Sequence, residues 1–114
     1  MPSVNIYISN PEIGERIAEI AAELRQFIAA RLSGDDRTLQ ASEVSLRLHQ
    51  CGDVGMIAPL ELEITAFHYK SRVSQQDEIC REVGAFIQES DPQLPLPHVW
   101  LILCELGHSC EEPV

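Results

Sequence analysis

The chain has 114 residues, of which 18 are acidic and 8 are basic, and its formal net charge at pH 7 is -10. This length suits one domain with one hydrophobic core, and the negative charge disfavours partners that are themselves anionic. We therefore expect neither nucleic acid nor a membrane among the partners. No apolar run approaches the roughly 20 residues that cross a bilayer, and the N-terminus lacks a signal-peptide pattern, so we predict a cytoplasmic protein.

The first 34 residues predict a strand followed by a long helix. The segment SVNIYIS alternates apolar and polar residues, which is the pattern of a half-buried strand. Asn10 and Pro11 then suit the N-cap and the first position of a helix. Apolar residues recur at intervals of three and four up to Leu32 and stop before Ser33-Gly34, so the helix is expected to end there.

Three more strands and one more helix are predicted in the rest of the chain. The runs EVSLRLH and LELEITAFHY both alternate and predict strands, and CGDVG between them predicts a turn. Ser74 and Asp77 predict the capping pair of a second helix that runs to about Ser90. Three prolines between Asp91 and Pro97 end that helix. The dense apolar run HVWLILCEL predicts a well-buried fourth strand.

This order of elements predicts an α+β fold in which two βαβ units form a four-stranded sheet with two helices on one face. We expect a single domain over residues 1–114, with two halves at about 1–50 and 56–106. The pattern leaves open a ferredoxin-like sandwich or two side-by-side βαβ units. The other face of the sheet is polar, and it is either wet or covered by another subunit; its expected residues are Asn5, Tyr7, Ser45, Arg47, His49, Glu61, Glu63 and Thr65.

Pro2 stands immediately before the first predicted strand. Proline is tolerated at the first residue of a strand, where its missing N–H costs little, so this position needs no chemical explanation. If Met1 is removed, however, Pro2 becomes a free secondary amine, which is a candidate catalytic base. Removal is a condition of this chemistry, because a peptide nitrogen has its lone pair delocalised into the amide.

Several segments together resemble the tautomerase superfamily, and within it most closely the 5-carboxymethyl-2-hydroxymuconate isomerase branch. They are the MP start, the long first helix, the strand SLRLH, the strand end FHYKSR and a second helix with an acidic first turn. The resemblance implies two side-by-side βαβ units, a homotrimer and no cofactor. It also implies a tautomerase or isomerase that moves a proton in a small unsaturated 2-hydroxy or 2-oxo acid.

By position, the resemblance implies Pro2 as the catalytic base, with Arg47 in SLRLH and Arg72 in KSRVS binding the carboxylates of the substrate. A guanidinium group fits a carboxylate with two hydrogen bonds and stabilises a developing dienolate, which makes chemical sense of both arginines. Plainer interpretations stay open for each. Arg47 is also placed to pair with Glu61 or Glu63 across the sheet, and Arg72 with Lys70 beside it also suits a solvated turn.

Two other functions remain as alternatives. The first is a noncatalytic oligomeric or small-ligand-binding protein of the same fold, in which Pro2 merely begins a strand. The second is a metal-binding ferredoxin-like domain that uses Cys104, His108 and Cys110, although their spacing matches none of the common structural zinc patterns. The sequence has no glycine-rich phosphate loop, so we expect no nucleotide cofactor, and we assign no residue to a metal.

Overall fold

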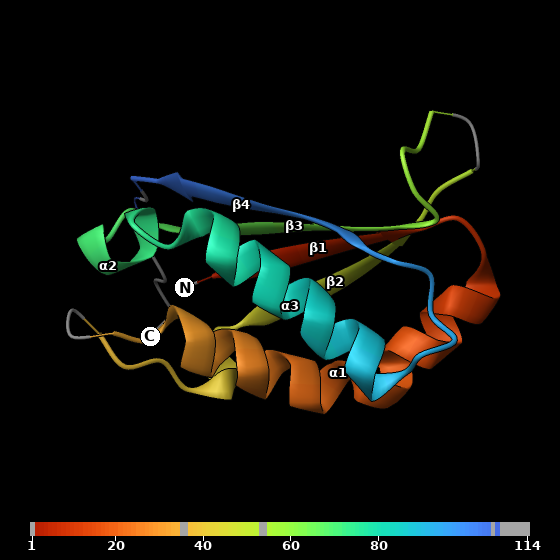
Figure 1. Cartoon of the computed structure of the whole chain (residues 1–114), viewed down its shortest axis with the longest axis horizontal. Helices are drawn as coiled ribbons and strands as arrows, with labels where there is room; N and C mark the ends of the chain where they lie inside the picture. The colour runs from red at the N-terminus through yellow and green to blue at the C-terminus, as the bar shows by residue number, and fades with distance from the viewer. Residues whose placement is uncertain (1, 35–36, 53–54, 106, 108–114) are drawn as a thin grey trace, which may run out of the picture.

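Two layers make up the protein, whose computed structural model describes residues 2–34, 37–52, 55–105 and 107. One layer is a four-stranded sheet, and the long helices α1 (Pro11–Leu32) and α3 (Gln76–Ser90) lie together on one face of it (Figure 1). The predicted α+β fold class is thereby confirmed. The strands are β1 (Ser3–Ile8), β2 (Ser45–Gln50), β3 (Leu60–Phe67) and β4 (His98–Cys104), with short helices η1 (Ala41–Glu43) and α2 (Lys70–Val73).

The sheet has the strand order β2-β1-β3-β4. β1 runs parallel to β2, β3 runs parallel to β4, and the central pair β1 and β3 is antiparallel. Each parallel pair is connected through one long helix, so the molecule consists of two βαβ units placed side by side. Of the two architectures left open above, this is the second. Ser3 is aligned with Ser45 on one side and with Thr65 on the other, which fixes the register of the central strands.

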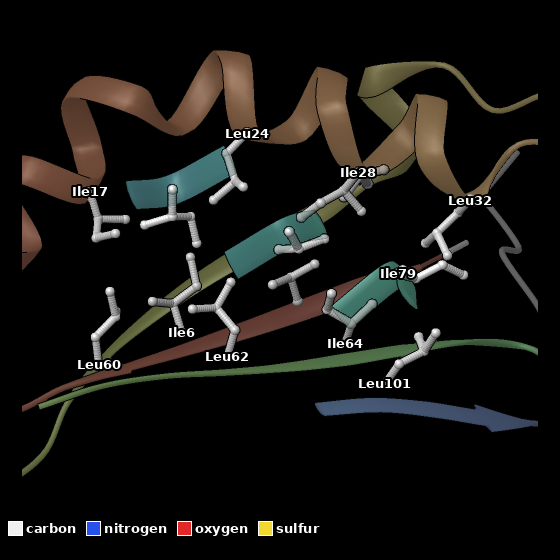
Figure 2. Close-up of a cluster of buried hydrophobic side chains, with 14 of the residues drawn as sticks. Ile6, Ile17, Leu24, Ile28, Leu32, Leu60, Leu62, Ile64, Ile79 and Leu101 are labelled. Atoms are coloured by element: carbon white, nitrogen blue, oxygen red, sulfur yellow. The ribbon is translucent and has the colours of Figure 1, made fainter. Parts of the chain in front are cut away.

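The core lies between the sheet and the two long helices, and it is almost entirely aliphatic. β1 and β3 alternate between buried residues and half-buried ones, up to the exposed Phe67 at the end of β3, as expected of a sheet covered on one face. Figure 2 shows side chains of α1 pointing toward those of the strands; the labelled residues are Ile6, Ile17, Leu24, Ile28, Leu32, Leu60, Leu62, Ile64, Ile79 and Leu101. Within the described ranges, no helix is both long and apolar enough to cross a membrane.

The helix α1 begins and ends where the sequence predicts. The Asn10 side chain accepts a hydrogen bond from the Ile13 N–H at 3.1 Å, and the Ser33 N–H donates to the Ala29 carbonyl at 3.1 Å. Gly14 in the first turn is buried against the sheet: a Cβ there would lie 2.7 Å from Cδ1 of Ile8. Glycine therefore lets the start of α1 approach β1 closely.

Two expectations about the second half are wrong. Ser74 does not cap α3, because it is the C-cap of α2, and its hydroxyl donates to the Ser71 carbonyl at 3.3 Å; α3 begins after Gln75, which makes no side-chain cap bond. β4 is not well buried either. It forms the edge of the sheet, so Trp100 and Ile102 are 41% and 45% exposed on the face that carries no helix.

Candidate active site

Pro2 is buried and directly precedes β1. Its carbonyl accepts a hydrogen bond from the Ser45 N–H at 3.1 Å, so the first residues of β1 are held to the start of β2. On the other side, the pairing of Ser3 with Thr65 brings the start of β1 to the end of β3. Pro2 consequently lies at the end of the sheet where β3 leaves it.

Arg72 belongs to the same end of the molecule. Its Nε donates to the Leu32 carbonyl at 3.1 Å and its Nη1 to the Phe67 carbonyl at 3.0 Å, so it joins the end of α1 to the end of β3. Its guanidinium group also lies 4.8 Å from the centroid of the Tyr69 ring. Arg72 is only 4% exposed, and the interpretation as a solvated turn residue is therefore wrong.

A polar cavity of about 300 Å³ lies beside Arg72, between the end of α1 and the α2–α3 region. Arg31 lines it and forms an ion pair with Glu82 and a 2.8 Å hydrogen bond to Oε1 of Gln75. Ser33 lines it too, and its hydroxyl donates to the Ala29 carbonyl at 2.7 Å. Guanidinium and hydroxyl groups are donors that proteins use to hold carboxylates, but here Arg31 and Ser33 already have these partners within the chain. Its lining comprises Arg31, Leu32, Ser33, Gly34, Ser71, Arg72, Gln75 and Ile79.

Sequence reasoning did not find Arg31, Ser33 and Gln75 as site residues. Ser33 was recognised only as a helix end, and the separation of these residues in sequence hides their proximity. The only local signal is a polar Ser-Gly pair directly after the last turn of α1, which contains Arg31. Such a helix end places hydrogen-bond donors and a cation where the chain turns. Which residues of other elements lie opposite them depends on the topology of the fold.

Arg47 lies elsewhere. It is exposed and aligned with Asn5 of β1, whose neighbours in the strand, Val4 and Ile6, are buried under the helices. Arg47 therefore projects from the opposite face of the sheet, away from Arg72. In the part of the chain that the structure describes, it makes neither a hydrogen bond nor an ion pair, and the pairing with Glu61 or Glu63 proposed above is absent there. Asn5 separates Arg47 from Glu63 in the register.

We call the helix-free side of the sheet the open face. It holds one ordered polar cluster: Nε2 of His49 lies 2.9 Å from Oδ1 of Asn5, and the His49 ring stacks on that of Tyr7 with centroids 5.0 Å apart. The opposite edge of the face is apolar. The residues of the open face include Ser3, Asn5, Tyr7, Ser45, Arg47, His49, Glu61, Glu63, Thr65, His98, Trp100 and Ile102.

Of the three residues of the metal-binding alternative, the structure describes only Cys104. Cys104 lies half-buried at the end of β4 as a free thiol, whereas His108 and Cys110 lie outside the described residues. Among the residues that are described, no three histidine, cysteine or acidic side chains come together as a group that would hold a metal ion.

The fold is tautomerase-like, and several solved structures share it. A fused 4-OT, described as an asymmetric trimer, superposes with a TM-score of 0.62 and 18% identity over 93% of this chain and 91% of its own. N1, a member of the cis-3-chloroacrylic acid dehalogenase family, superposes with a TM-score of 0.59 and 16% identity over 90% of this chain and 75% of its own. Leishmania major MIF2 superposes with a TM-score of 0.56 and 12% identity over 96% of this chain and 93% of its own.

Comparisons of the sequence itself found no match. No family model matches this chain, and no curated protein sequence matches it. Since all three structural similarities are below 20% identity, they concern the fold and leave the chemistry to be argued from the residues of this chain.

Proposed function

We propose that the protein is a cofactor-independent tautomerase or isomerase that acts on a small unsaturated 2-hydroxy or 2-oxo acid, with Pro2 as the base once Met1 is removed. The observation that carries this proposal is the position of Pro2: it is buried at the end of the sheet that also holds Arg72 and the polar cavity. The tautomerase-like fold supports it.

In the proposed reaction the Pro2 amine accepts the proton of the 2-hydroxyl group and returns a proton to a carbon of the conjugated chain. The intermediate is a dienolate, whose negative charge is spread between oxygen and carbon. Burial disfavours a protonated amine, so an amine in this position would act as a base near neutral pH. Arg72 would stabilise the developing negative charge and bind one carboxylate.

Arg47 enters this proposal through assembly. In one chain it projects from the open face while Arg72 lies at the helix side, so the two arginines cannot hold the same small substrate. We propose a homotrimer, as in the fused 4-OT, in which Arg47 of one subunit reaches the site of another. The likeness of sequence to the 5-carboxymethyl-2-hydroxymuconate isomerase branch suggests a substrate with more than one carboxylate, and a cytoplasmic location remains a prediction.

The test is the rate of ketonisation of 2-hydroxymuconate or phenylenolpyruvate by protein whose mass establishes the loss of Met1. Pro2→Ala is expected to lower kcat by about 10²-fold or more, since general acid–base catalysis contributes roughly that much. Arg47→Gln is expected chiefly to raise KM. Protein that retains Met1 provides the matched control, because it has the same fold without the free amine.

Three results would decide against catalysis by Pro2. They are equal rates for wild type and Pro2→Ala, equal rates with and without Met1, or native protein whose Met1 is never removed. The noncatalytic protein of the same fold would then be the better description, with Pro2 serving only to begin β1.

A further inference from the structure

A hollow on the surface lies away from Pro2. Its volume is about 560 Å³, and it is formed by one side of α3 and the segment that leads into β4. His98 at its wall is aligned with Glu61, at the opposite end of β3 from Phe67 and Arg72. The hollow is therefore separate from the candidate active site. Its size falls within the range of small-molecule sites in proteins.

The hollow forms because α3 faces the core with one row of buried apolar residues and has small residues next to that row. Ile79, Val83 and Ile87 are buried, whereas Gly84 and Ala85 leave the neighbouring strip open. A Cβ on Gly84 would lie 3.8 Å from Cγ2 of Val99 and 3.9 Å from Cγ of Pro97, which is ordinary contact. Close packing therefore does not require glycine here, although glycine costs a helix interior about 0.5–1 kcal/mol relative to alanine.

The walls of the hollow are mostly apolar, although Gln88 and His98 also belong to its lining. Leu96 is 66% exposed at its rim, and Val99 and Pro97 form part of its floor. Cys80 belongs to the same lining, and burial, with a smaller contribution from Asp77, raises the pKa of its thiol. The thiol is thus neutral at pH 7 and contributes a weakly polar surface. An apolar ligand placed here would remove these side chains from water.

One cation stands at this apolar surface. Arg81 lines the hollow, and within the described residues it forms no hydrogen bond and no ion pair. The chain as a whole has a formal charge of -10, which repels anions at long range. At about 0.15 M ionic strength, however, charges more than about 8 Å away are largely screened, so the charges close to Arg81 decide what binds beside it. These include Asp77 and Glu78 of the same helix, which line a neighbouring depression together with Arg81.

We propose that this hollow binds a small organic acid with an apolar body, the acid group pairing with Arg81 and the body lying on Leu96 and Val99 beside Gly84. A guanidinium group suits a carboxylate or sulfonate, and the apolar walls suit an aliphatic or aromatic body. This inference does not depend on the proposed isomerase activity, because it uses none of the residues of that site.

Two fluorescent probes of the same shape test the proposal on the full chain. 8-Anilinonaphthalene-1-sulfonate carries an acid group, and N-phenyl-1-naphthylamine has the same apolar body without it. Both are expected to bind wild type at one saturable site. Arg81→Gln is expected to weaken binding of the sulfonate about 5-fold, the upper range for one exposed ion pair, and to leave the neutral probe within about 2-fold.

Gly84→Leu places a side chain in the hollow and is expected to abolish saturable binding of both probes. Gly84→Ala, which fits without a clash, is expected to weaken binding of both probes while stabilising the helix. This smaller variant keeps the proposal testable if Gly84→Leu fails to fold. Lys70→Gln removes an exposed cation of α2 that lies outside the lining of the hollow and serves as the matched control, with unchanged affinities.

Absence of saturable binding to wild type would overturn the proposal, as would full binding by Gly84→Leu with its secondary structure intact. Equal affinity of wild type and Arg81→Gln for the sulfonate would overturn the role of Arg81. None of these three results bears on catalysis, which is measured separately through Pro2.

Discussion

At the scale of single residues, Arg72 is the side chain whose position departs most from what the sequence suggests. A segment reading KSRVS has three polar residues around it and resembles solvated surface. The structure instead buries the arginine, because two elements end beside it and their last carbonyls need donors. A single sequence cannot reveal this requirement, since Leu32 and Phe67 are 35 residues apart and meet only through the topology.

Replacement of Arg72 should therefore destabilise the protein whether or not the protein is an enzyme. Arg72→Ala removes donors from two carbonyls, and each hydrogen bond to a charged group is worth about 1.5–3 kcal/mol. We expect the free energy of unfolding, measured by urea denaturation, to fall by about 2–4 kcal/mol. Lys70→Ala, an exposed neighbour, is the control and should change it by less than about 0.5 kcal/mol. An Arg72→Ala variant as stable as wild type would contradict this structural role.

At the scale of elements, the sequence correctly predicts an element boundary when the residues that fix it lie close together in the chain. Asn10-Pro11 gives the start of α1 because the Asn10 side chain bonds within its own helix. The same reasoning fails at Ser74, because α2 precedes α3 and uses that residue as its own C-cap. It fails again for HVWLILC, whose apolar character suits a central strand, whereas its place at the sheet edge depends on the order of all four strands.

One contact between elements has a defined dependence on pH. Nη1 of Arg16 in α1 donates to both carboxylate oxygens of Asp91, the C-cap residue of α3, at 3.1 and 2.9 Å. The hydrogen bond from Arg16 is the main cause that lowers the pKa of Asp91 below its ordinary value of 3.8. The folded state thus binds this proton less readily than the unfolded chain. Stability from the pair is present above pH of about 4 and is lost as pH falls through the lower pKa of the folded state.

We therefore expect Asp91→Asn to have a lower urea midpoint than wild type at pH 7, with the difference narrowing as the pH is lowered below about 4. Because the pair is accessible to water, the difference should be small and should shrink in high salt. Glu89→Gln, which removes an exposed carboxylate of the same helix, is the control and should show no such narrowing. A difference that grows toward acid pH would contradict the assignment.

At the scale of the whole molecule, the two faces of the sheet are unequal. Both long helices cover one face, and the other carries Trp100 and Ile102, which are about half exposed, beside the polar cluster of His49 and Tyr7. Large apolar side chains grouped on one surface are typical of interaction sites. The sequence predicted the polar half of this face, but it placed the apolar half in the core, since edge and centre of a sheet differ only in their neighbours.

The proposed trimer should accordingly depend on the apolar edge of the open face. Trp100→Glu puts a charge into a surface that becomes buried only on assembly, so it should convert a trimer into monomers while circular dichroism remains unchanged. Ala22→Glu adds the same charge to the exposed outer side of α1 and should leave the trimer intact. Light scattering coupled to gel filtration at about 0.15 M salt, where repulsion between acidic copies is largely screened, gives the mass of each variant. A monomeric wild type, or a Trp100→Glu variant that remains trimeric, would show that the open face is not the seat of assembly, and Arg47 would then have no route to a neighbouring site.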